Sequence, residues 1–63
     1  MRILLPPFGY IFEGEVNADN EQDVLDVCLS LSDDPQFKEV VKNDTHKGRL
    51  KNLKAMGFRI ENK

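Results

Sequence analysis

Cys28 and His46 are the only cysteine and the only histidine in this 63-residue chain, and together they offer its only thiol and imidazole. Catalysis by such a pair needs a nucleophile, a base and an orienting group held together in space. Cys28 stands in the apolar run Val24–Leu29, where burial blocks access to a thiol and disfavours its reactive thiolate form. We therefore expect a packing cysteine, no catalytic residue and no enzymatic activity.

Metal and phosphate chemistry have no recognisable site in the sequence. The alternating residues from Asn17 to Asp23 imitate a calcium loop, but Gln22 and Cys28 occupy the positions where glycine and a bidentate glutamate belong. One histidine and one cysteine are too few for a four-ligand zinc site, and there is no glycine-rich phosphate loop. We expect no metal and no cofactor, and we expect His46, in its lysine-flanked segment, to be a solvated surface residue.

Charge is the strongest remaining signal, because the two parts of the chain carry opposite excess. Residues 1–37 hold one cation against eight acidic residues, a balance of −7, and residues 38–63 hold eight cations against three acidic residues, a balance of +5. Such asymmetry steers a charged partner. The basic candidates for binding nucleic acid or another anionic partner are His46, Lys47, Arg49, Lys51, Lys54 and Arg59. The acidic candidates for docking a basic protein are Glu13, Glu15, Asp19, Glu21, Asp23 and Asp26.

Hydrophobic alternation predicts the strands that would support these side chains. Ile3–Leu5 and Tyr10–Val16 are rich in aliphatic and aromatic residues, and the segment Pro6–Gly9 between them has the composition of a turn. We therefore predict an N-terminal β-hairpin. Residues 58–61 alternate apolar and polar as a terminal strand, which we expect at the edge of that hairpin.

Three short helices are predicted between the hairpin and the last strand. The first should be the most buried, because its apolar residues repeat at helical spacing: Val24, Val27, Cys28 and Leu31. The expected N-caps are, in order, Asp19 or Asn20, then Asp34 before Pro35, then Asp44 or Thr45. Gly57 has the position of the left-handed residue that ends a helix in a Schellman motif, which would bring Phe58 against Leu53.

The predicted fold is a single α+β domain over residues 1–63. A small antiparallel sheet, made of the N-terminal hairpin and the C-terminal strand, packs against three short helices in the order β-β-α-α-α-β. The expected core is Ile3, Leu5, Tyr10, Phe12, Val24, Val27, Cys28, Leu31, Phe37, Val40, Val41, Leu50, Leu53, Phe58 and Ile60. A lone cysteine, no secretory leader and no apolar span indicate a cytoplasmic protein without a membrane partner.

The segment Gly48–Ile60, a basic helix followed by glycine and a strand, resembles the last helix and first wing strand of winged-helix DNA-binding domains. That resemblance implies contact of the third helix with DNA or RNA. Our first hypothesis is different: a small non-enzymatic binding protein that acts as a regulator, adaptor or inhibitor through contacts with another protein. Its size fits a phage-type accessory protein, and open strand edges make a homodimer or a β-augmented complex further expectations. Nucleic-acid binding is the alternative.

Overall fold

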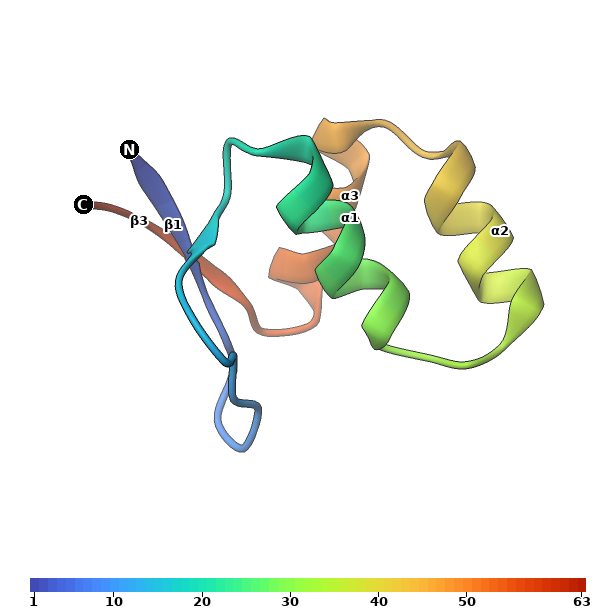
Figure 1. Cartoon of the computed structure of the whole chain (residues 1–63), viewed down its shortest axis with the longest axis horizontal. Coiled ribbons are helices and arrows are strands. Elements are labelled where there is room, and N and C mark those ends of the chain that lie inside the picture. Colours follow the sequence, from blue (N-terminus) through green and yellow to red (C-terminus); the bar gives the residue numbers. More distant parts are fainter.

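The computed structural model describes all of residues 1–63, and its elements follow the predicted order (Figure 1). They are β1 (Arg2–Leu5), β2 (Val16–Asn17), α1 (Glu21–Ser30), α2 (Pro35–Asn43), α3 (His46–Ala55) and β3 (Arg59–Asn62). The strands form one antiparallel sheet in the order β2-β1-β3, so the C-terminal strand joins the sheet beside the central β1. The predicted small α+β fold is confirmed.

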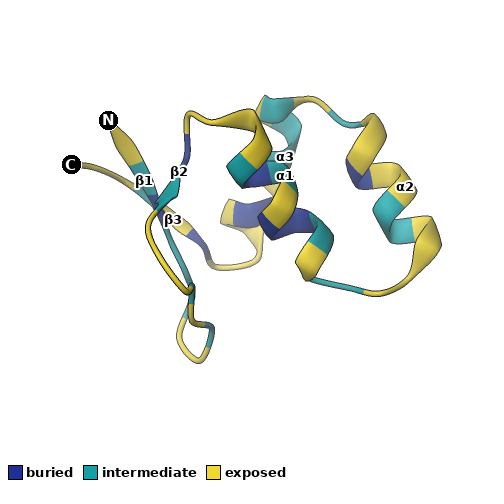
Figure 2. Ribbon diagram, in the orientation of Figure 1, coloured by how far each residue is buried: buried dark blue, intermediate teal, exposed yellow.

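Helix α1 is the centre of the helical layer. It packs against α2, α3 and β2, whereas α2 lies farthest from the sheet (Figure 1). Three residues of α1 are buried, against two of α3 and one of α2. Figure 2 shows the buried segments gathered where α1, α3 and the sheet meet, with most of α2 exposed. The prediction that the first helix is the most buried is therefore confirmed.

The core contains nine buried residues: Leu4, Ala18, Val24, Val27, Cys28, Val41, Leu50, Leu53 and Phe58. All except Leu4 and Ala18 belong to the predicted core. The prediction for Val40 is wrong, because its side chain is 62% exposed. Phe37 and Val41, one helical turn apart, take the inward side of α2 and leave Val40 outside.

Strand β1 turns the opposite face inward from the one predicted. Leu4 is 2% exposed, whereas Ile3 and Leu5, predicted inside, are half-buried. Leu4 is paired in register with Val16 of β2 and Ile60 of β3, so these three side chains share the inner face of the sheet. The prediction fails because three consecutive apolar residues carry no alternation from which to choose a face.

The second strand is much shorter than predicted. Only Val16–Asn17 pairs with β1, and the rest of the predicted strand Tyr10–Val16 is a loop. In this loop the rings of Tyr10 and Phe12 pack against Phe58, with centroids 5.4 and 6.0 Å from its ring. Aromatic pairs of this kind stabilise a fold by about 0.5–1.5 kcal/mol beyond their burial. Packing against Phe58 thus competes with strand pairing and turns the loop toward the core.

Each helix begins at one of the predicted capping residues. The side chains of Asn20, Asp34 and Thr45 accept backbone N–H bonds from the first turns of α1, α2 and α3. Pro35 stands at the start of α2, where its missing N–H removes no helical hydrogen bond. These local contacts determine where the helices start.

Helix α3 ends in the predicted reversal at Gly57. The φ angle of Gly57 is +102°, a conformation that favours glycine. The Gly57 N–H donates to the Lys54 carbonyl at 3.1 Å and the Phe58 N–H donates to the Leu53 carbonyl at 3.0 Å. These are the two bonds of a Schellman motif, and Leu53 and Phe58 both join the buried core. The reversal returns the chain as β3, which pairs with β1.

Replacing Gly57 with alanine should lower the free energy of unfolding by about 1–2 kcal/mol, because a left-handed backbone is costly for a residue with a Cβ. The new Cβ would also lie 3.2 Å from the Cβ of Pro7. Gly14→Ala is the matched control, since a Cβ there meets nothing within 4 Å and φ is not positive. Urea unfolding followed by circular dichroism measures both variants. Equal losses of stability would contradict this role of Gly57.

Candidate functional site: a cationic groove

Helix α3 places three lysines on one of its sides. Lys47, Lys51 and Lys54 follow one another at i, i+4 and i+7, and all three are exposed. Residues at this spacing are neighbours on a helix surface. Leu50 and Leu53 point into the core, which fixes the rotation of the helix about its axis. We call Lys47, Lys51 and Lys54 the lysine stripe.

A groove of about 490 Å³ runs between the lysine stripe and the sheet. It is lined by Arg2, His46, Lys47, Leu50, Lys51, Lys54 and Ile60. Leu50 and Ile60 supply apolar surface, and the other lining residues carry nitrogen. The groove therefore combines positive charge with a hydrocarbon floor.

The lysine stripe has no acidic partner within the chain. Only two ion pairs are present, Arg2 with Asp19 and Lys63 with Glu15. The Arg2 guanidinium donates to Asp19 Oδ1 through Nη2 at 2.6 Å and through Nε at 2.9 Å. These hydrogen bonds lower the pKa of the Asp19 carboxyl and raise that of Arg2. Because Asp19 offsets the charge of Arg2, the excess positive charge of the groove comes from the lysine stripe.

His46 lies at the start of α3 and is half-buried, so the prediction of a solvated histidine is wrong. Its Nε2 lies 2.9 Å from the carbonyl oxygen of Ala18. A carbonyl only accepts, so Nε2 carries the proton and donates this bond. The bond ties the N-terminus of α3 to the segment between β2 and α1. The prediction rested on the lysines that flank His46 in the sequence. The environment of His46 is set instead by its contact with Ala18, 28 residues away in the sequence.

Arg49 and Arg59 do not join the lysine stripe. The Arg49 guanidinium donates to the carbonyls of Val41 at 2.9 Å and Lys42 at 3.2 Å, which are in the last turn of α2. It thereby adds side-chain hydrogen bonds to carbonyls of the last helical turn, and the Val41 carbonyl also accepts from the Asp44 N–H at 3.2 Å. Arg59 is paired with Leu5 and lies on the outer face of the sheet, away from the helices. The six basic candidates therefore occupy three separate places.

Most of the acidic candidates have partners inside the chain. Asp19 binds Arg2, and Glu15 forms an ion pair with Lys63. Asp23 accepts from the backbone N–H of Asn17 at 3.2 Å, and Asp26 accepts from Gln22 at 2.8 Å. The two exposed candidates that make no such contact are Glu13 and Glu21. Four of the six acidic candidates thus take part in contacts within the chain, which involve β2, α1 and the segments beside them.

Sequence reasoning missed Arg2 and Ile60 as parts of the groove. Both side chains lie on the same face of the sheet as Leu4. Choosing Ile3 and Leu5 as the inner residues of β1 placed Arg2 on the wrong face. Placing Leu4 in the core would have put Arg2 on the inner face as well, because residues two positions apart in a strand point to the same face.

A second, apolar cleft of about 240 Å³ lies where α1, α2 and α3 meet. Cys28 and Leu53 contribute to its lining, together with Phe37 and Met56. Cys28 is only 3% exposed, and its burial raises the pKa of the thiol. A neutral, enclosed thiol packs like a small hydrophobic side chain, in agreement with the predicted role of Cys28.

Comparison with protein-family models, with curated proteins and with solved structures finds no match for this chain. In the helices, length and apolar content fall short of what a membrane crossing needs.

Iodoacetamide should alkylate Cys28 at least about tenfold more slowly in the folded protein than in denaturing urea at the same pH, because the thiolate is the reactive form and is here disfavoured and enclosed. Mass spectrometry of samples quenched over time measures both rates. The same chain unfolded is its own control, since it contains no other cysteine. Similar rates in the two states would contradict the packing role.

Proposed function

We propose that this chain is a small non-enzymatic binding protein that acts through protein–protein contacts, and that the cationic groove holds an acidic segment of the partner. The observation that carries this proposal is the lysine stripe, three exposed ammonium groups on one side of α3 without an acidic partner. A regulator, adaptor or inhibitor works in this way, since occupation of a surface on the partner is sufficient for its effect.

Electrostatics favours an acidic partner at this place. Like charges at i, i+3 and i+4 on a helix repel by roughly 0.2–0.5 kcal/mol per pair. Lys47, Lys51 and Lys54 stand at these spacings, so a carboxylate that binds between them removes repulsion and adds attraction. Complementary charge of this kind raises the rate of association and selects among partners.

The groove fits a protein segment better than a phosphate backbone. Leu50 and Ile60 line it with hydrocarbon, which aliphatic side chains of a peptide can cover. The whole chain has a net charge of −2, so an extended polyanion meets repulsion beyond the groove. On duplex DNA, contacts of three lysines with phosphates would release about three counterions. The logarithm of the binding constant would then fall with the logarithm of the salt concentration at a slope of roughly −2.7. Nucleic acid remains the second candidate because the lysine stripe lies on α3, the helix that resembles the last helix of winged-helix DNA-binding domains.

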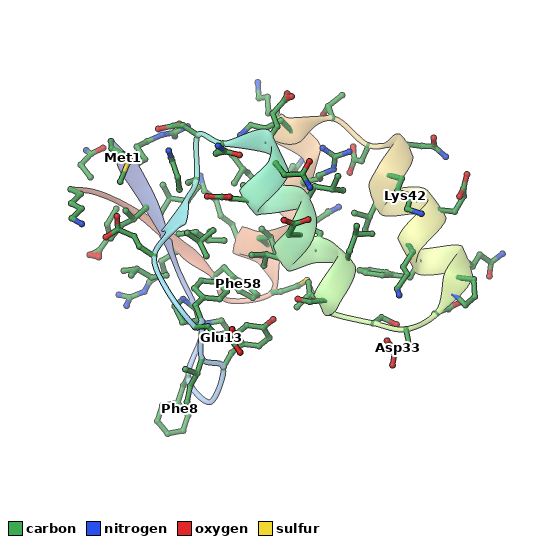
Figure 3. All side chains as sticks on the ribbon, viewed as in Figure 1. Met1, Phe8, Glu13, Asp33, Lys42 and Phe58 are labelled. Carbon is green, nitrogen blue, oxygen red and sulfur yellow. The ribbon has the colours of Figure 1, made fainter.

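The double variant Lys47→Glu with Lys51→Glu should bind an acidic peptide at least about tenfold more weakly, because two attractive charges become repulsive ones. The probe is a fluorescein-labelled peptide of alternating glutamate and valine, followed by fluorescence anisotropy. The matched control is Lys38→Glu with Lys42→Glu on α2, which makes the same change of net charge outside the groove. Figure 3 shows Lys42 on α2, across the molecule from the sheet. The control should stay within about threefold of the original protein.

Two further measurements complete this test. Circular dichroism must show that both double variants are folded, and a pull-down from the native host should lose its protein partner with the groove variant alone. Titration with duplex and single-stranded DNA between about 50 and about 200 mM salt measures the alternative. Steeply salt-dependent DNA binding that requires Lys47 and Lys51, with no binding of the acidic peptide, would contradict the proposal.

A further inference from the structure

Strand β3 is an edge of the sheet, and alternate backbone groups along it face outward. The sheet order β2-β1-β3 leaves no strand on the far side of β3. The Lys63 N–H donates to the Met1 carbonyl at 2.8 Å, which sets the phase of the antiparallel ladder. Because hydrogen-bonded and non-hydrogen-bonded pairs alternate, the backbone of Glu61 bonds to β1 and that of Ile60 and Asn62 points away from it. These outward groups can receive another strand.

The lysine stripe stands beside this open edge. Ile60 lines the same groove as Lys47, Lys51 and Lys54. Helix α3 and β3 are consecutive and lead away from the same reversal at Gly57, with the groove between the lysine stripe and Ile60. Arg49 lies on another side of α3, where it contacts α2. The charged side of α3 and the open backbone of β3 therefore form one surface.

We propose that this surface binds its partner by β-augmentation: an extended acidic segment pairs with the backbone of Ile60 and Asn62 as a fourth strand, and its carboxylates on the helix side meet the lysine stripe. The inference rests on the proposed function and names the conformation of the segment. Backbone hydrogen bonds supply affinity in this mode of recognition, and alternate side chains supply specificity.

The spacing of the charges fits a strand. Same-face side chains of a strand recur roughly every 6.6 Å, and the lysines of the stripe are offset by about 6 and about 4.5 Å along the axis of α3. Lysine side chains are long and flexible, so two successive carboxylates of one strand face reach Lys47, Lys51 or Lys54. A bound helix would satisfy the charges but would leave the open backbone of β3 unpaired.

A second copy of this chain is a poorer occupant of the edge. Antiparallel pairing of two β3 strands would bring the two lysine stripes to the same contact, and like charges there oppose association. The β3 strand of the second copy carries one basic and one acidic residue, Arg59 and Glu61, and not a run of acidic residues. An acidic strand removes the repulsion that a second copy adds.

Backbone N-methylation of the probe peptide separates pairing from charge. The parent is the peptide of alternating glutamate and valine, and two derivatives carry N-methyl groups on either its glutamates or its valines. Both derivatives keep all carboxylates. A paired strand presents only one of these two sets of N–H groups to β3, so one derivative should bind at least about tenfold more weakly than the parent and the other should stay within about threefold.

Amide hydrogen exchange of the labelled protein supplies the second readout. The parent peptide should slow exchange at Ile60 and Asn62, and the weak-binding derivative should not. Equal binding by all three peptides would overturn β-augmentation while leaving the acidic-partner proposal intact, and equal loss with both derivatives would also overturn it. Failure of the parent to bind would remove the proposed function as well. Concentration-dependent protection of the two amides without peptide would identify a second copy as the occupant and overturn the inference.

Discussion

The reversal at Gly57 is the interaction on which the groove depends, because it joins the helix that carries the charge to the strand that carries the open edge. Two backbone hydrogen bonds close α3 there, and the chain returns as β3 beside β1. Phe58 enters the core directly after the turn and packs against the aromatic rings of the loop between β1 and β2. Backbone hydrogen bonds and the packing of Phe58 thus both stabilise the turn. The turn in turn sets how far the lysine stripe lies from the edge of β3.

Two of the three arginines serve internal contacts, whereas the lysine stripe is left to solvent. Arg2 donates to the Asp19 carboxylate through two nitrogens, and Arg49 donates to two carbonyls at the end of α2. A planar guanidinium with several donors suits such forked contacts, and a mobile, strongly hydrated ammonium suits an open surface. Arg2 and Arg49 therefore hold elements of the chain together, and the lysine stripe stays exposed to solvent.

Features decided by neighbouring residues were predictable from the sequence, and features decided by distant contacts were not. The caps of the helices and the turn at Gly57 depend on a few adjacent residues, and the structure confirms them. The inner face of β1 depends on what packs below it, so Leu4 was missed. His46 and Arg49 looked like members of one basic face, but their partners Ala18 and Val41 come from other elements. The predicted basic site and the observed groove have His46 and the lysine stripe in common, and only the lysine stripe is exposed without a partner in the chain.

The register of β3 against β1 tests the account most directly, because it decides which amides of β3 face outward and whether Ile60 lies beside the lysine stripe. Residues in non-hydrogen-bonded antiparallel pairs bring their Cα atoms to roughly 4.5 Å, close enough for strong Hα–Hα nuclear Overhauser effects. The observed register predicts these effects between Arg2 and Asn62 and between Leu4 and Ile60. Effects that instead join Ile3 to Ile60 would mean a register slipped by one residue, with Ile60 turned away from the groove, and would contradict the account.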